Sequence, residues 1–175
     1  MSEALKTQGT RVPQPEMDLE SVGAEYLTFL LGAEDYGVDI LRVQEIRGWE
    51  QVTRIPNQPG YVKGVLNLRG SIVPIFDLRE RLGMPGRDYD KATVVIVLKV
   101  LDEYSEKSVG VVVDGVSDVL NATAKDIAAT PDFGSRLDTE FITGLASAGG
   151  KMIMLLDVDK LQPPAGREND EFDEA

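Results

Sequence analysis

Short apolar runs recur along the middle of the chain, and turn-forming residues separate them. Runs of this length that are rich in Val and Ile and bounded by Gly, Pro, Asp or Asn are typical of β-strands. They span 26–31, 36–40, 41–46, 65–68, 72–78, 93–100, 109–113, 116–120 and 152–156. No amphipathic pattern is long enough to predict a substantial helix. The pattern therefore predicts an all-β fold, either barrels or a sandwich.

Dipeptides between the runs predict tight turns. Arg69-Gly70 fits a two-residue hairpin turn in which Gly supplies a positive φ, and Asp114-Gly115 has the same form. Glu34-Asp35 is predicted to be a further hairpin tip. Pro74 lies within a strand pattern, and because proline has no N–H to donate, we expect the strand to be an edge or bulged there.

Three short segments predict single helical turns. These are 123–126, which resembles a capping motif, and the segments 79–82 and 158–161. The polar stretch 83–91 contains Pro85 and Gly86 and is the best boundary between two halves. We therefore expect one folded domain over 26–161, with approximate halves 26–84 and 92–161.

The two ends of the chain differ in charge from the middle. Residues 1–25 hold two basic against five acidic residues, and residues 162–175 hold one against five. Both ends contain prolines and few large apolar groups. They are therefore predicted to be disordered acidic tails. The composition, 42% hydrophobic and 27% charged over 175 residues, fits a folded middle.

Composition also excludes several kinds of chemistry. The chain has no Cys and no His, which excludes disulfides, thiolate nucleophiles and imidazole ligands. A net charge of −12 repels phosphate backbones, so nucleic acid is not an expected partner. No run approaches the roughly 20 apolar residues needed to span a bilayer, and the N-terminus is not typical of a signal peptide. We expect a cytoplasmic binding protein without a cofactor, a metal or catalytic residues.

A few residues are candidates for binding. The segment 64–71 is glycine-rich but lacks the Lys of a phosphate-binding loop. Asp114 and Asp118 are better explained as turn and strand residues than as a catalytic pair. Arg69 is either a solvated hairpin residue or a guanidinium that grips a partner's carboxylate in a bidentate manner. Trp49 and Tyr61 either cover the core or rim a binding groove.

Five segments together resemble a known family. They read YGVDILRVQEIR at 36–47, QVTRIPN at 51–57, KGVLNLRGSIVPI at 63–75, TVVIV at 93–97 and GVVVDGVSDVL at 110–120. In this order and spacing they resemble CheW, the coupling-protein family of bacterial chemotaxis. The resemblance implies two five-stranded SH3-like β-barrels that share a hydrophobic core.

The resemblance also implies a function. Proteins of this family are adaptors that link the cytoplasmic tips of chemoreceptors to the histidine kinase CheA at membrane-associated arrays. The regulatory domain of that kinase has the same fold, so rings with it or with other copies of the chain are possible. No enzymatic activity and no cofactor are implied.

Site residues follow from the same resemblance. Receptor-binding positions fall on Arg69, Val43, Glu45, Ile40, Gly64 and Gly70. Positions tied to kinase binding, or to both partners, fall on Thr93, Val94, Val95 and Gly110, although a structural role is open for Val94 and Gly110. The segment 99–108 is longer and more charged than is usual in the family and should project, and the acidic C-terminal segment has no implied role.

Three other functions remain open from sequence. A CheW-like protein could serve a parallel array that controls surface motility or a second messenger. An enzyme would need carboxylate or lysine chemistry in a deep cleft. An SH3-like reader of proline-rich peptides would need an aromatic groove, and aromatic residues make up only 6% of the chain.

Overall fold

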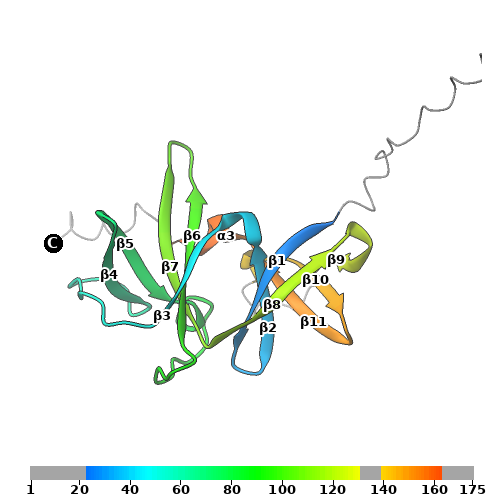
Figure 1. Cartoon of the computed structure of the whole chain (residues 1–175), viewed down its shortest axis with the longest axis horizontal. Coiled ribbons are helices and arrows are strands. Elements are labelled where there is room, and N and C mark those ends of the chain that lie inside the picture. The colour runs from blue at the N-terminus through cyan, green and yellow to red at the C-terminus, as the bar shows by residue number, and fades with distance from the viewer. Residues whose placement is uncertain (1–22, 131–138, 163–175) are drawn as a thin grey trace, which may run out of the picture.

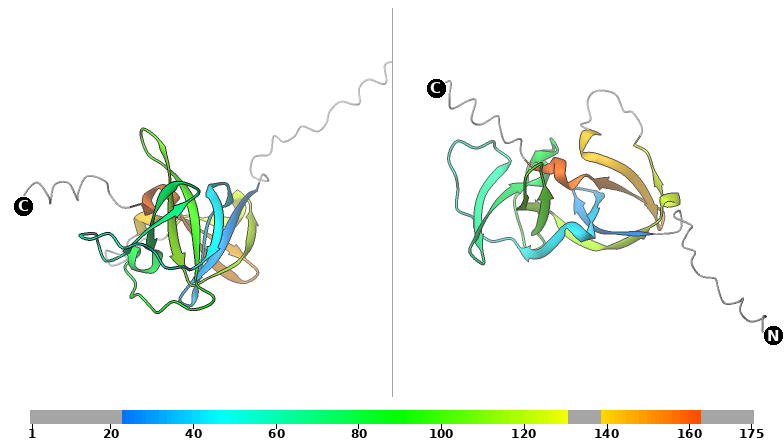
Figure 2. Two further views of the ribbon diagram at one scale, coloured as in Figure 1. Left: turned by 60° about the vertical axis from the view of Figure 1, so that its left-hand side comes forward. Right: turned by 90° about the horizontal axis from the view of Figure 1, so that it is seen from above.

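The structure, a computed structural model, describes residues 23–130 and 139–162. The predicted tails at 1–25 and 162–175 lie almost wholly outside these ranges. The all-β prediction is confirmed: the described residues form two sheets with only short helical turns between the strands. Figure 2 shows the two groups of strands side by side. The two-sheet arrangement agrees with a pair of SH3-like barrels.

The first sheet, sheet A, has the strand order β8-β1-β2-β11-β10-β9. Its strands are β1 (Ala24–Leu31), β2 (Glu34–Asp39), β8 (Gly115–Ala122), β9 (Ile127–Ala128), β10 (Ile142–Ala148) and β11 (Lys151–Leu156). All neighbours are antiparallel except β2 and β11, which are parallel. The resemblance implies five strands in each barrel, and the sixth strand of sheet A is β9, which has only two residues. The sequence pattern missed β9 and β10, because Gly144 and small residues break the apolar run of 142–148.

The second sheet, sheet B, has the strand order β3-β6-β7-β5-β4. Its strands are β3 (Val43–Gly48), β4 (Val62–Leu68), β5 (Ser71–Asp77), β6 (Val94–Leu101) and β7 (Glu106–Val113). Sheet B is therefore one continuous stretch of chain, and sheet A is built from the chain before and after it. The boundary expected at 83–91 falls between β5 and β6, inside the stretch that forms sheet B.

Each sheet contains a hairpin that is followed by a short helix. In each case an Asp at the end of the hairpin's second strand, or directly after it, caps that helix. Asp77 caps α2 (Leu78–Arg81), and Asp157 caps α3 (Val158–Leu161). Because β4–β5 and β10–β11 occupy equivalent places, the hairpin turns between them can be compared directly.

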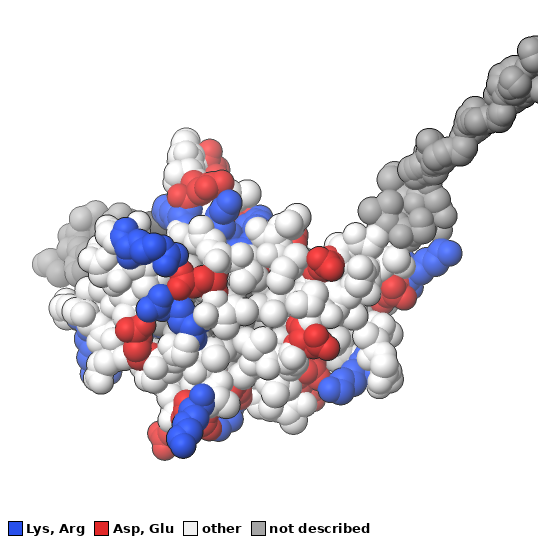
Figure 3. All heavy atoms as spheres, viewed as in Figure 1, with Lys and Arg blue, Asp and Glu red and all other residues white. Residues whose placement is uncertain are grey.

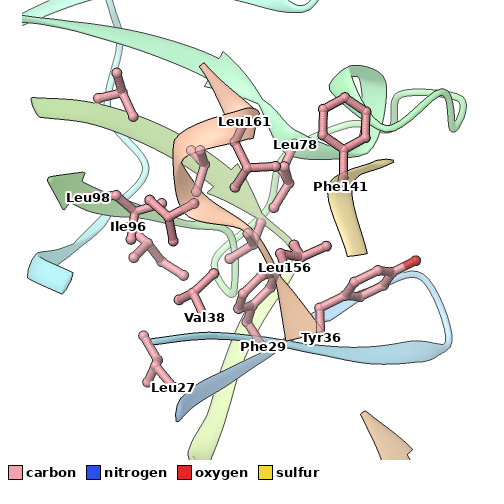
Figure 4. Packing of buried hydrophobic residues seen from close by; sticks show 14 of the residues in the cluster. Leu27, Phe29, Tyr36, Val38, Leu78, Ile96, Leu98, Phe141, Leu156 and Leu161 are labelled. Atoms are coloured by element: carbon pink, nitrogen blue, oxygen red, sulfur yellow. The ribbon is translucent and has the colours of Figure 1, made fainter. Parts of the chain in front are cut away.

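The main core lies between the sheets. Phe29 and Val38 from sheet A and Ile96 and Leu98 from sheet B are all buried there, and Figure 4 shows them pointing toward one another. A second cluster fills the other face of sheet B and includes Ile75, which is fully buried. Burial on both faces explains why the runs in β6 and β7 read as continuously apolar.

The tight turns predicted from dipeptides are confirmed in part. Arg69-Gly70 is a two-residue hairpin turn, as predicted. Pro74 lies where β5 has a neighbour on one side only, because the ladder to β7 begins at Ile75. The prediction for Glu34-Asp35 was wrong, because Gly32 takes the positive φ and the turn lies at residues 32–33.

The prediction that Asp114-Gly115 forms a hairpin turn was also wrong. Strand β7 ends at Val113 in sheet B, and β8 begins at Gly115 in sheet A, so Asp114 is the point where the chain crosses between sheets. Gly115 does not take a positive φ. The Asp-Gly dipeptide resembles a hairpin turn in sequence, but it is equally suited to a sharp change of direction without strand pairing.

The predicted projection at 99–108 is present as the tip of the β6–β7 hairpin, which extends beyond its neighbours in Figure 1. Asp102 accepts hydrogen bonds from the backbone N–H groups of Tyr104 and Ser105 and so shapes the tip. The side chain of Tyr104 is 90% exposed.

Candidate functional site

The Arg69-Gly70 turn has an unusual backbone for its sequence. Arg69 has φ 53° and Gly70 has φ 88°. The equivalent turn of sheet A is Gly149-Gly150, with φ 58° and 80°. A left-handed conformation costs a residue with a side chain about 1–2 kcal/mol. Sheet A avoids that cost with glycine, and sheet B accepts it to place an arginine that is 76% exposed at the tip.

Arg69 is held by a chain of charges that runs along β3. Its Nη2 donates to Glu45 Oε1 at 2.5 Å, and Glu45 Oε2 accepts from Arg47 Nη1 at 2.7 Å. Arg47 Nη2 in turn donates to Glu50 Oε2 at 2.8 Å. The hydrogen bonds from Arg47 and then Arg69 lower the pKa of Glu45 below its ordinary value. The four side chains form one alternating row of charges.

A hollow opens beside this row. It measures about 430 Å³ and is lined by Gln44, Glu45, Leu68, Arg69, Ser71, Val73, Val97 and Ser108. It adjoins a groove of about 510 Å³ between β5 and β7. These two strands pair only at Ile75–Asp77 and diverge before that point, as Figure 1 shows for the hairpins that carry them. Arg69 therefore lines a hollow that is continuous with an open groove.

The other predicted receptor-binding residues do not all join Arg69. Gly70 is next to it and exposed, but Gly64 is buried against the backbone of Thr53. Ile40 and Val43 are half-buried and pack on the core between the sheets. The cause is a bulge in β3 between Val43 and Glu45, which turns these two side chains to opposite faces of sheet B. Arg69, Glu45 and Gly70 form one cluster, and Ile40 and Val43 form another.

The predicted kinase-binding residues are mostly interior. Thr93 and Val95 are 4% and 0% exposed. Gly110 is buried, and an added Cβ would lie 2.5 Å from Ile75 Cδ1. Val94 is half-buried against the core between the sheets. Because Thr93, Val95 and Gly110 are buried, any part they play in partner binding would act through the packing of sheet B, and their assignment to kinase binding stays a prediction.

The two aromatic candidates have different surroundings. Tyr61 packs edge-on against Phe76 and under the guanidinium of Arg81, so it covers the core. Trp49 packs edge-on against Tyr89 and also lines a separate hollow with Arg54 and other polar residues. The sequence pattern did not indicate Arg47 or Arg42. Arg47 depends on a contact with Glu50, and Arg42 depends on contacts with residues distant in sequence.

Asp114, one of the two carboxylates weighed as a catalytic pair, is held by hydrogen bonds within the fold. Asp114 Oδ2 accepts from Gly32 N at 2.7 Å and from Arg79 Nη1 at 2.9 Å, which accounts for its buried position. No cluster with metal-ligand composition occurs among residues 23–130 and 139–162. Figure 3 shows acidic and basic side chains next to one another rather than in a patch of single sign. The helices in the described ranges are all too short to span a membrane.

Comparisons with known proteins agree with this geometry. Residues 25–163 match the family model described as a CheW-like domain. The chain is 55% identical over 142 residues to a chemotaxis protein CheW of Klebsiella aerogenes, covering 81% of this chain and 83% of that protein. It is 39% identical over 150 residues to a chemotaxis protein CheW of Rhizobium meliloti, covering 86% and 94%.

A solved structure is also similar. The crystal structure of the scaffolding protein TtCheW from Thermoanaerobacter tengcongensis matches with a TM-score of 0.74 and 32% sequence identity. The match covers 83% of this chain and 97% of that one.

Proposed function

The chain belongs to the CheW-like family of chemotaxis scaffold proteins, and we propose that it couples chemoreceptors to the histidine kinase CheA without catalysing a reaction itself. In this proposal the protein is cytoplasmic and is recruited to receptor arrays at the membrane. Its partners are the receptor tips and the kinase's regulatory domain. No specific observation favours the parallel-array alternative.

The backbone of Arg69 is the observation that supports this proposal best. A hairpin under selection for stability alone would place Asn or Gly at a position with φ 53°. An exposed arginine at that position is explained by a partner that needs its guanidinium. The planar guanidinium suits a carboxylate, which it can bind through two parallel hydrogen bonds.

The proposed mechanism is a competition at one arginine followed by a shift in population. A receptor carboxylate binds Arg69 while Glu45 keeps its second partner, Arg47, so Glu45 is not left unpaired. Ligand-driven changes in the receptor tip alter this contact and thereby the arrangement in which the kinase is held. Thr93, Val95 and Gly110 contribute by maintaining sheet B.

Receptor-stimulated kinase activity in reconstituted membranes tests the proposal. Four samples are compared with a no-protein control: the unmodified chain, Arg69→Glu, Arg69→Asn and Lys125→Glu. Asn tolerates the left-handed conformation, so Arg69→Asn should fold at least as well as the unmodified chain. Lys125→Glu makes the same change of charge on the exposed turn η4 (Ala124–Asp126) of the other sheet.

We expect the unmodified chain and Lys125→Glu to activate the kinase strongly. The kinase activation produced by each Arg69 variant should be at least tenfold lower than that of the unmodified chain. Thermal melting establishes that the variants are folded. An unmodified chain that fails to activate a matched receptor and kinase would refute coupling. Full activation by Arg69→Asn would refute the assignment of Arg69.

A further inference from the structure

Within residues 23–130 and 139–162 the chain crosses between the two sheets at two places, and each crossing carries an arginine–aspartate pair. The first crossing is η3 (Ile40–Arg42), between β2 and β3, and it contains Arg42. The second is Asp114, between β7 and β8. These pairs were not evident from sequence, because each joins residues that are far apart along the chain.

The first pair joins η3 to α3 and β6. Arg42 Nη1 and Nη2 donate to Asp159 Oδ1 and Oδ2 at 2.7 and 2.8 Å, and Nη1 also donates to Lys99 O at 2.9 Å. Asp159 Oδ1 accepts from Leu101 N at 2.8 Å. Asp159 follows β11 of sheet A, whereas Lys99 and Leu101 belong to β6 of sheet B. The pair therefore ties both sheets to the crossing between them.

The second pair lies at the other crossing and is joined by one hydrogen bond rather than two. Asp114 Oδ2 accepts from Gly32 N, in the β1–β2 turn of sheet A, at 2.7 Å. The same oxygen accepts from Arg79 Nη1, in the helix that follows β5 of sheet B, at 2.9 Å. Arg79 and Asp114 have side chains only 15% and 11% exposed. Arg87 lies 3.4 Å from the same carboxylate.

Between the two crossings, the sheets meet mainly through the apolar side chains of the core, and Arg81 of α2 adds hydrogen bonds to the carbonyl oxygens of Leu161 and Gln162. Apolar contact favours burial but is not directional, so it does not by itself fix the angle between two smooth sheet faces. Charge-assisted hydrogen bonds are directional, and a bidentate pair fixes orientation as well as distance. We infer that the Arg42–Asp159 and Arg79–Asp114 pairs act as two clamps that set the orientation of the sheets, and that kinase activation requires this fixed orientation.

The inference rests on the proposed function and extends it. An adaptor that binds one partner on each side transmits a change only if its own two halves do not rotate freely. Loosening the clamps should therefore leave binding intact and reduce the transmitted activation. All four clamp residues are positioning residues in this scheme.

Two measurements on the same variants test the inference. Because the chain has no Cys, thiols introduced as Arg54→Cys and Lys125→Cys allow spin labels to be placed, one in the loop between β3 and β4 of sheet B and one on η4 between β8 and β9 of sheet A. Pulsed electron paramagnetic resonance then gives the distribution of distances between the sheets. The clamp variant is Asp159→Asn with Asp114→Asn, and Arg42→Lys is a milder variant that keeps the charge but loses the bidentate geometry.

Asp35→Asn is the matched control. Asp35 pairs with Lys151 at 3.7 Å, and both residues lie in sheet A, so this change removes an ion pair within one sheet. Receptor and kinase binding are measured by co-sedimentation with receptor membranes, and activation is measured in unlabelled protein. Thermal melting establishes that each variant is folded.

We expect the clamp variant to have a broadened distance distribution, binding within twofold of the unmodified chain, and at least a fivefold loss of activation. Arg42→Lys should be intermediate, and Asp35→Asn should match the unmodified chain. A narrow distribution in the clamp variant, or full activation despite a broad one, would overturn the inference and leave the proposed function intact. An unmodified chain that does not activate the kinase would overturn both.

Discussion

Glu45 and Arg69 are 24 residues apart in the chain, and a hydrogen bond of 2.5 Å joins their side chains. The bond connects β3 to the turn between β4 and β5 beside the hollow. Because Arg69 is largely exposed, this ion pair contributes little net free energy. A partner's carboxylate can therefore compete with Glu45 for the guanidinium.

The pKa of Glu45 provides a direct test of this network. Arg47 and Arg69 both donate hydrogen bonds to its carboxylate, so Arg47→Met and Arg69→Met should each raise the pKa of Glu45 toward its ordinary value. The lowered pKa means that the charged form is favoured in the folded protein. The interaction is therefore fully present above the unfolded pKa and is lost as pH falls through the lower, folded pKa. Carboxyl-carbon NMR titration measures each midpoint, and a midpoint in either variant equal to that of the unmodified chain would contradict the prediction.

Gly110 should be required for packing rather than for contact. In Gly110→Ala the new methyl group would lie 2.5 Å from Ile75 Cδ1 and 2.9 Å from Val95 Cγ1. We expect a loss of about 1–3 kcal/mol in the free energy of unfolding. Ile75→Val removes the nearer of these two atoms. The double variant should therefore lose less free energy of unfolding than the sum of the losses in the two single variants. Urea unfolding of the four proteins measures this coupling, and strict additivity would argue against the clash.

Gly64 and Gly70 should differ sharply in their tolerance of a side chain. At Gly64 an added Cβ would lie 2.2 Å from the carbonyl oxygen of Thr53, which belongs to the backbone and cannot rotate away. At Gly70, with φ 88°, nothing lies within 4 Å of an added Cβ. Gly70→Ala should therefore cost only backbone strain, about 1–3 kcal/mol, and Gly64→Ala should cost more. Thermal melting of both variants decides, and the reverse order would contradict the prediction.

Tyr89 should contribute to stability through one buried acceptor. Its hydroxyl donates to Asp77 Oδ2 at 2.5 Å, and Asp77 is 1% exposed. Burial, followed by this hydrogen bond, raises the pKa of Tyr89 above its ordinary value. Tyr89→Phe leaves a buried carboxylate oxygen without that donor and should cost about 1.5–3 kcal/mol in unfolding free energy.

The control for Tyr89 is the exposed Tyr104 at the hairpin tip. Tyr104→Phe should change the unfolding free energy by less than about 0.5 kcal/mol. Urea unfolding at neutral pH compares the two variants. A similar effect of both would show that the Asp77 contact contributes nothing specific.

Local patterns predicted much of this fold because they depend on neighbouring residues. The apolar runs of β6 and β7, the Arg69-Gly70 turn and the short helix after Asp157 were all predicted correctly. Asp114-Gly115 was misassigned, because the same dipeptide suits a hairpin and a crossing between sheets. The strands with which β7 and β8 pair decide whether the dipeptide forms a hairpin or a crossing. No local sequence signal indicates those pairing partners.

By itself, the sequence determined the strand-rich class of this protein, its lack of thiol and imidazole chemistry and its family resemblance, and it singled out Arg69 as a candidate. Only the tertiary structure decided which residues meet. It buried Thr93, Val95 and Gly110, turned Val43 and Glu45 to opposite faces, and brought Arg42 to Asp159 and Arg79 to Asp114. The physical reason is that strand periodicity is a local property, whereas a bulge, a sheet crossing or an ion pair depends on residues brought together only when the chain folds.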